Sequence, residues 1–316
     1  MLRDKICWTS QLCLVSSTTI HRINPLQRVA SKDFLSMITE KPDPFDLEAT
    51  LPTGETAPGS PSQHRPGVGS AMPRVRSFGR TDMGLRRKNN EDAFHVDGDL
   101  GLCVLADGMG GAAAGELASQ IFAQTAVEVF TCHGTSTEDE VLGLLQQAYR
   151  MANERILSHV QEHPGHAGMG CTGEILRFFD ERFAIGHVGD SRAYLFRSSE
   201  LRQLTRDHSL VQDQVDQGLI TREEARRHRL RNVILRAVGT KEDLAVDFVR
   251  GRVLPGDIFL LCSDGLTDMI EDKVIWSVLS TAGRIDEKVD QLIELANRAG
   301  GNDNVTVVLS EVLEIP

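Results

Sequence analysis

Short apolar runs that stop at turn-forming residues dominate the chain between residues 74 and 316. Five of them have the length of strands, at 101–106, 183–188, 192–196, 258–262 and 304–309. Four longer stretches carry apolar residues at i, i+3 and i+4, which is the spacing of a helix with one buried face, at 113–130, 138–161, 272–281 and 286–299. The pattern therefore predicts a mixture of strands and helices.

The order of these elements narrows the fold class. Strand runs follow one another closely, as in 183–196, and helices come in pairs rather than one after each strand. This grouping favours an α+β fold, with antiparallel sheets and helices stacked outside them, over a doubly wound parallel sheet.

The region before residue 74 has a different composition. Seven of the 11 prolines fall between Pro42 and Pro73, among Gly, Ser and Thr and a single aromatic residue. Such a segment buries too little apolar surface to order itself, so we predict a disordered linker at 42–73. Residues 1–41 are then an N-terminal extension of unknown role, whose broken apolar middle argues against a secretory signal, and 74–316 form one domain.

Composition excludes several classes of protein. The chain has 316 residues, 41% hydrophobic and 25% charged, which is typical of a globular protein. Its net charge of −11 argues against a nucleic-acid partner. Six cysteines occur without a CxxC pair, and no apolar run has the length of a membrane span. We expect no structural zinc, no membrane partner and a cytoplasmic location.

Acidic residues recur where the predicted strands meet turns. The five clusters contain Glu91 and Asp92, Asp107 with Gly108, Asp190, Asp264, and Asp303. One Asp-Gly pair is usually only a turn, but five acid-bearing strand ends in one domain predict an all-oxygen site. Carboxylates, carbonyls and water are the ligands of Mg²⁺ and Mn²⁺, and the glycine after Asp107 lets the backbone come close.

A pair of hard cations suggests displacement at phosphorus, with a bridging water as nucleophile. The phosphate then needs a cationic side chain. Arg87 lies four residues before Glu91 and can offer a bidentate guanidinium. The alternative is that Arg86, Arg87 and Lys88 form a solvated turn.

Seven blocks of the sequence resemble one known family. In order they are TDMGLRRKNNEDA, LADGMGGAAAGELAS, HVGDSRAYLF, LTRDHSLVQ, NVILRAVG, CSDGLTD and GGNDNVTVVL. Over residues 75–312 they are similar to the metal-dependent Ser/Thr protein phosphatases (the PPM or type 2C class) in their compact bacterial form. The resemblance implies an α-β-β-α sandwich of two antiparallel sheets around a dinuclear Mn²⁺ or Mg²⁺ centre.

The resemblance also implies roles for individual residues. Asp107 bridges the two ions and the Gly108 carbonyl ligates one, while Asp264 and Asp303 complete the first site. Glu91 and Asp92 serve the second ion, and Asp190 recruits a weaker third. Arg87 binds the substrate phosphate, and residues 207–240 form a flap beside the active site.

Some positions depart from the family pattern. Ala112, Cys171 and Arg229 replace residues that are common in relatives, and none of the three is an expected ligand. Met109 stands where animal members carry a histidine, and a methionine cannot donate a proton. The group that protonates the leaving oxygen could then be His187, His208, His228 or a metal-bound water. We favour the water.

The predicted function is hydrolysis of phosphoserine and phosphothreonine on proteins, opposing a bacterial-type Ser/Thr kinase, by a monomer. A catalytically silent binding module of the same fold is the alternative, although all the expected metal acids are present. A two-metal nuclease or phosphodiesterase fits the negative net charge poorly.

Overall fold

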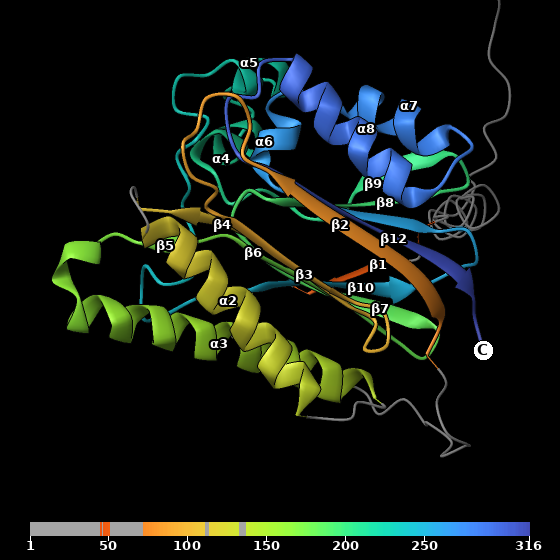
Figure 1. Ribbon diagram of the computed structural model, residues 1–316, viewed down its shortest axis with the longest axis horizontal. Coiled ribbons are helices and arrows are strands. Elements are labelled where there is room, and N and C mark those ends of the chain that lie inside the picture. Colours follow the sequence, from red (N-terminus) through yellow and green to blue (C-terminus); the bar gives the residue numbers. More distant parts are fainter. Residues whose placement is uncertain (1–44, 46, 51–71, 111–113, 133–136) are drawn as a thin grey trace, which may run out of the picture. The chain divides into compact units, whose positions relative to one another are not determined.

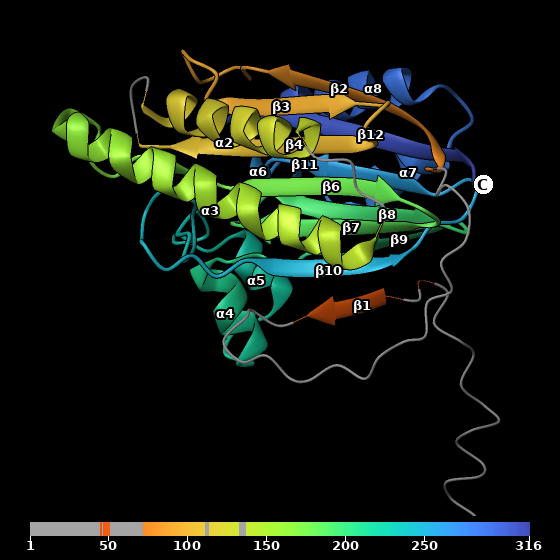
Figure 2. The same cartoon turned by 90° about the horizontal axis from the view of Figure 1, so that it is seen from below.

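The computed structural model describes residues 45, 47–50, 72–110, 114–132 and 137–316. Within these ranges all strand pairs are antiparallel and form two sheets (Figures 1 and 2). The larger has the order β1-β10-β7-β6-β4-β3, with β5 paired to β4; the bounds are β1 Leu47–Thr50, β3 Asp92–Asp97, β4 Leu102–Met109, β5 Gly170–Cys171, β6 Gly173–Phe179, β7 Arg182–Val188 and β10 Asp247–Arg252. The smaller has the order β2-β12-β11-β8-β9, with β2 Arg74–Asp82, β8 Arg192–Arg197, β9 Glu200–Gln203, β11 Ile258–Cys262 and β12 Val305–Glu314.

Helices cover the outer face of each sheet (Figure 1). The larger sheet is covered by α2 (Ala114–Thr131) and α3 (Glu138–Glu162), and the short helix η2 (Pro164–His166) follows α3. The smaller sheet is covered by α6 (Asp264–Thr267), α7 (Asp272–Ser280) and α8 (Ile285–Arg298). The expected α+β sandwich of two antiparallel sheets is therefore confirmed.

Alternating side chains explain why the central strands are apolar throughout. On β4, Val104 and Ala106 face α2 and α3, whereas Cys103 and Leu105 lie between the two sheets. On β11, Leu260 faces the helices of the other side and Leu261 faces the inter-sheet core. Both faces of these strands are buried, so their sequences lack the polar alternation of a half-exposed strand.

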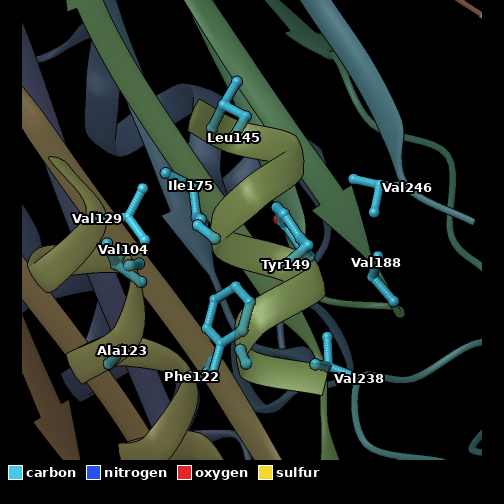
Figure 3. Close-up of a cluster of buried hydrophobic side chains, with 14 of the residues drawn as sticks. Val104, Phe122, Ala123, Val129, Leu145, Tyr149, Ile175, Val188, Val238 and Val246 are labelled. Atoms are coloured by element: carbon cyan, nitrogen blue, oxygen red, sulfur yellow. The ribbon is translucent and has the colours of Figure 1, made fainter. Parts of the chain in front are cut away.

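The core beneath α2 and α3 is built around two rings (Figure 3). Phe122 from α2 and Tyr149 from α3 meet edge to face, with centroids 5.1 Å apart. They pack with Val104 and Ile175 from β4 and β6, and the Tyr149 hydroxyl donates to the Gly173 carbonyl at 2.8 Å. This packing fixes both helices on the sheet that carries Asp107.

Several elements differ from the sequence prediction. Strand β4 continues to Met109, past the expected end at residue 106, because Gly108 and Met109 pair with Cys171 and Gly170 of β5. Strands β2, β5, β6, β9 and β10 were not predicted. The four predicted helices are confirmed, with their ends displaced by no more than a residue or so.

A further strand lies inside the range predicted to be a disordered linker. Strand β1 pairs with β10 and forms the edge of the larger sheet, and the Phe45 side chain before it is buried between the sheets. The Arg197 guanidinium donates to the Phe45 carbonyl at 3.1 Å. The linker prediction is therefore wrong at 47–50, because backbone pairing with β10 and burial of the Phe45 ring are enough to order these residues. The extension at 1–41, linker residues 51–71 and Ala112 lie outside the described residues.

No helix within the described ranges is both long and apolar enough to cross a membrane.

Candidate metal centre

The acidic clusters converge at one end of the two sheets. Asp92 on β3 and Asp107 on β4 lie directly opposite each other in the larger sheet. Asp264 follows β11 and Asp303 precedes β12, and these two strands are neighbours in the smaller sheet. Burial raises the pKa of Asp107 well above its usual range, and the charges of Asp92, Asp264, Asp190 and Asp303 raise it further. The four strand ends therefore form one acidic site.

Two buried carboxylate oxygens in this site receive no hydrogen bond from the described residues. They are Asp92 Oδ1 and Asp264 Oδ1. The other oxygen of Asp92 accepts from Thr306 Oγ1 at 2.6 Å and Ser263 Oγ at 2.9 Å. Burial nevertheless raises the pKa of Asp92 to about 6. A buried oxygen without a donor is costly, and a cation would satisfy it.

Close backbone contacts bring a helix to the same point. The Gly108 N–H donates to the Glu91 carbonyl at 3.1 Å. A Cβ on Gly108 would lie 2.1 Å from the Gly115 carbonyl oxygen in the first turn of α2, so only glycine fits there. A Cβ on Gly115 would lie 2.4 Å from Glu91 Oε2. The glycines around Asp107 thus let α2 begin beside the acids, with Glu91 between them.

Arg87 lies at the acidic site. Its Nη2 donates to Asp303 Oδ2 at 2.6 Å, and half of its side chain is exposed. That hydrogen bond, with the charges of Asp303, Glu91 and Asp107, raises the pKa of Arg87 against the opposing effect of burial. The neighbours Arg86 and Lys88 are exposed. Arg87 is also exposed, but its guanidinium contacts one of the expected metal ligands, and its role in binding a phosphate stays a prediction.

Asp190 extends the acidic site on the side of the predicted flap. It follows β7 and is buried, and burial, followed by the charges of Asp207 and Asp268, raises its pKa to about 7.

A cleft of about 910 Å³ begins at Asp190 and Asp264 and runs between the flap helices and α6 and α7. The flap helices are α4 (Leu210–Asp216) and α5 (Arg222–Arg226). This cleft is large enough for a peptide side chain and its neighbours.

Several supporting residues were not found from the sequence. Thr172 binds Asp107 twice, because its N–H donates to the Asp107 carbonyl at 2.8 Å and its Oγ1 accepts the Asp107 N–H at 2.9 Å. Asn304 accepts the Glu91 N–H at 2.8 Å, and its amide donates to the Met83 and Asn89 carbonyls of the loop that carries Arg87. Asn304 follows Asp303 directly, and that adjacency was the only available signal.

The donor set fits hard divalent cations. In the described part of the chain, no three His, Cys, Asp or Glu side chains already surround a single point. Arg87 takes up one oxygen of Asp303. Asp92, Asp107, Asp264 and Asp303 nevertheless supply only oxygen ligands, two of whose buried atoms lack donors. Mn²⁺ and Mg²⁺ match such a set.

The candidate proton donors occupy different environments. His187 Nδ1 binds Glu174 Oε1 and its Nε2 lies 2.8 Å from the Arg206 carbonyl, so both ring nitrogens are engaged in the core. His208 is also buried, with Nδ1 accepting the Gly189 N–H and Nε2 at 3.0 Å from Asp247 Oδ2. His208, expected in or beside the flap, is therefore held in the core at the start of that segment. His228 accepts the Leu230 N–H within its own loop.

Three of the four cysteines described by the structure are unsuited to nucleophilic catalysis. Cys103, Cys171 and Cys262 are buried, whereas Cys132 is exposed, and all four are free thiols. Burial raises the pKa of the first three thiols, so they stay protonated at neutral pH. These three thiols belong to the core.

Residues 86–313 match the family Protein phosphatase 2C. The chain is 41% identical to the serine/threonine protein phosphatase PstP of Mycobacterium tuberculosis over 242 residues, covering 76% of this chain and 45% of PstP. The chain thus spans less than half the length of that relative. It is 36% identical to the protein phosphatase PhpP of Streptococcus pneumoniae, covering 74% of this chain and 96% of PhpP.

Two solved structures have the same fold. The catalytic domain of PstP in complex with 2 manganese ions superposes with a TM-score of 0.70 and 39% identity, covering 76% of this chain and 99% of that one. Stp1 from Staphylococcus aureus, a serine/threonine phosphatase, superposes with a TM-score of 0.73 and 35% identity, covering 79% of this chain and 99% of Stp1. Both likenesses include the domain that carries the acidic site.

Proposed function

The chain belongs to the Protein phosphatase 2C family, and from this premise we propose that it is a metal-dependent protein serine/threonine phosphatase. The observation that carries the proposal is the buried cluster of aspartates from both sheets, which lies beside Arg87 and contains carboxylate oxygens without donors. An acidic site cannot hold a phosphate by itself. It needs cations between its carboxylates and the substrate oxygens.

We assign two Mn²⁺ or Mg²⁺ ions to this site. Asp107 would bind both ions, and the Gly108 carbonyl, Asp264 and Asp303 would bind the first of them. Glu91 and Asp92 would serve the second ion, and Asp190 a weaker third. When bound, the ions supply an acidified water for attack on phosphorus and neutralise charge on the phosphoryl oxygens.

The protein's own groups orient this site. Thr306 and Ser263 hold Asp92 through its Oδ2 and leave Oδ1 for a cation. Thr172 fixes the backbone of Asp107 from both sides. Ligands held in this way lose little freedom on binding, and partners of this kind tune affinity for the ion.

Arg87 would bind the substrate phosphate. Its guanidinium presents several donors in one plane, and among the described residues Nη2 donates to Asp303. A phosphate dianion placed between Arg87 and the cations would receive a bidentate pair of hydrogen bonds. This arrangement fixes the phosphorus atom for displacement in line with the leaving oxygen.

The leaving alkoxide of phosphoserine needs a proton. His187 and His208 have both ring nitrogens engaged in the core, which removes them as donors to a substrate. We propose that water in the cleft beside Asp190 supplies this proton. The phosphoprotein segment would lie in the same cleft, between the flap helices and α7.

The substrates are proposed to be phosphoserine and phosphothreonine proteins, the targets of a bacterial-type Ser/Thr kinase, and the enzyme is proposed to act as a monomer. The full chain should hydrolyse p-nitrophenyl phosphate and a phosphothreonine peptide with Mn²⁺ or Mg²⁺, and a chelator should abolish both activities. A thiol-blocking reagent should leave them intact. Peptide binding without release of phosphate at any metal concentration would favour the catalytically silent module instead.

A further inference from the structure

One face of the flap helix α5 carries two arginines that have no carboxylate partner. Arg222 and Arg226 are the first and last residues of this helix and lie four positions apart, which places them on the same face. Both line the cleft that begins at Asp190 and Asp264. From this juxtaposition we propose that the cleft selects phosphoproteins with Asp or Glu close to the phosphorylated residue. The inference rests on the proposed phosphatase function and adds a substrate class to it.

The charge of the cleft wall differs from that of the whole chain. Among the described residues, eight basic side chains line the cleft against five acidic ones, leaving aside the proposed ligands Asp190 and Asp264. The chain as a whole has a net charge of −11. Basic side chains are therefore concentrated where the substrate polypeptide would lie, and they would attract an acidic segment to that place.

Most basic residues of the cleft wall are already neutralised by ion pairs. Four of the five acids are paired with basic residues of the same wall. Arg206 is paired with Asp213 and Asp216 of α4. On α5 itself, Arg227 is paired with Glu223 at 3.0 Å, on a different face from Arg222. Helix α5 therefore has an ion-paired face and a separate basic face that lines the cleft.

The positive charges of the basic face are not neutralised within the described part of the chain. The Arg222 side chain is exposed and has no ion pair or hydrogen bond among those residues. Arg226 Nη2 donates to the carbonyls of Thr267 at 3.1 Å and Ile270 at 3.3 Å, which fix the side chain but carry no net charge. Like charges four residues apart on a helix repel each other, and a carboxylate placed between them would remove that repulsion.

The hydrogen bonds of Arg226 also place it near the acidic site. Thr267 is the last residue of α6, which begins at Asp264 (Figure 1). Three residues of helix advance by about 4.5 Å, and an extended peptide advances by about 3.3 Å per residue. A substrate whose phosphate lies beside Arg87 would therefore bring side chains about two to four positions away to the basic face of α5.

The test compares two phosphothreonine peptides of the same length with the full chain and Mn²⁺. One peptide carries glutamate about two to four positions from the phosphothreonine on both sides, and the other carries glutamine at the same positions. We expect kcat/KM to be about 3- to 10-fold higher for the acidic peptide, mainly through a lower KM, as for one or two partly exposed ion pairs. The preference should become smaller as the salt concentration is raised.

Substitutions on α5 show whether the two arginines cause this preference. Arg222→Glu should abolish or reverse the ratio of the two kcat/KM values, and Arg226→Gln should reduce it, whereas Arg226→Lys should retain most of it. Arg229→Glu makes the same change of charge at an exposed flap arginine outside the cleft lining, and it should keep the wild-type ratio. Because each result is a ratio, a general loss of folded or active protein does not change it.

Two results would overturn the inference and leave the phosphatase function intact. The first is equal kcat/KM of the wild type for the two peptides, and the second is the same ratio in Arg222→Glu as in the wild type. If the wild type hydrolysed neither peptide and did not hydrolyse p-nitrophenyl phosphate, the phosphatase function and the inference would both be wrong.

Discussion

His208 and Gly189 bind each other twice. The His208 backbone N–H donates to the Gly189 carbonyl at 2.7 Å, and the Gly189 N–H donates to His208 Nδ1 at 3.1 Å. Gly189 has a φ of +115°, and a Cβ there would lie 2.6 Å from the Thr172 side chain. The beginning of the flap is thereby fixed to the residue that precedes Asp190.

This relationship predicts the effect of His208→Ala. Losing the ring leaves the Gly189 N–H unsatisfied in the core, which costs about 1–3 kcal/mol and loosens Asp190. The rates on p-nitrophenyl phosphate and on a phosphothreonine peptide should fall together, while His228→Ala should leave both near wild type. A loss confined to the peptide, whose leaving group alone needs a proton, would instead make His208 the general acid.

Asp107→Asn should have the largest effect on catalysis. It replaces a negatively charged ligand of both proposed cations with a neutral one. We expect kcat/KM to fall by more than about 100-fold, because mutation of a residue that only hydrogen-bonds to a metal ligand already lowers affinity or activity by about 10–100-fold. In the absence of metal, the urea midpoint of the same variant should be higher than that of the wild type, because the substitution removes one carboxyl group from a buried cluster of acids. Asp99→Asn, an exposed change in the turn at the other end of the β3–β4 hairpin, is the control. Near-wild-type turnover by Asp107→Asn would contradict the assignment of two ions.

Arg87 should contribute to phosphate binding in the ground state and the transition state. Arg87→Ala should lower kcat/KM by about 10–100-fold, the equivalent of one or two charge-assisted hydrogen bonds. Arg87→Lys should recover little of this, because an ammonium group cannot form a bidentate pair. Arg86→Ala provides the matched control one residue away. An unchanged kcat/KM for Arg87→Ala on a phosphopeptide would mean that this residue does not touch substrate.

Strand β1 changes the expected result of truncation. A chain that starts at residue 74 should still hydrolyse p-nitrophenyl phosphate, but it lacks β1 and Phe45. Its free energy of unfolding should be lower by about 2–3 kcal/mol than that of a chain starting at residue 44, as expected for exposing one buried aromatic side chain. Phe45→Ala in the longer chain should reproduce most of the loss. Equal urea midpoints for the two chains would argue that β1 adds nothing to the fold.

The buried Glu174–His187 pair should make stability depend on pH. Both nitrogens of His187 face acceptors, so the pair retains one proton in the folded state. Burial raises the pKa of Glu174 to about 7. Burial acts to lower the pKa of His187, but Glu174 and the Arg206 carbonyl raise it overall.

Both pKa values are higher in the folded state than in the unfolded state. Their stabilising contribution is therefore complete at low pH and is lost as the pH rises through about 7. Urea denaturation of the wild type between about pH 6 and pH 8 should show this fall, and Glu174→Gln should flatten it. A wild-type profile as flat as that of the variant would show that the pair holds no additional proton.

The helices, most central strands and the acid-bearing strand ends could be predicted from the sequence alone. Apolar periodicity has a direct physical cause in burial, so 138–161 and 258–262 could be located without any knowledge of partners. The Asp-Gly turns likewise marked Asp107 and Asp264 as acids at strand ends. The family resemblance then supplied a role for each, because local motifs carry that information.

The groups that surround those acids could not be predicted from the sequence. Thr172, Ser263 and Thr306 look like ordinary strand residues in the sequence, yet each binds a candidate ligand that is distant along the chain. His208 was expected in or beside a mobile flap and lies buried against Gly189, and the residues of β1 were expected to be disordered. Hydrogen bonds and burial of this kind depend on which strands become neighbours, and hydrophobic periodicity does not encode that choice.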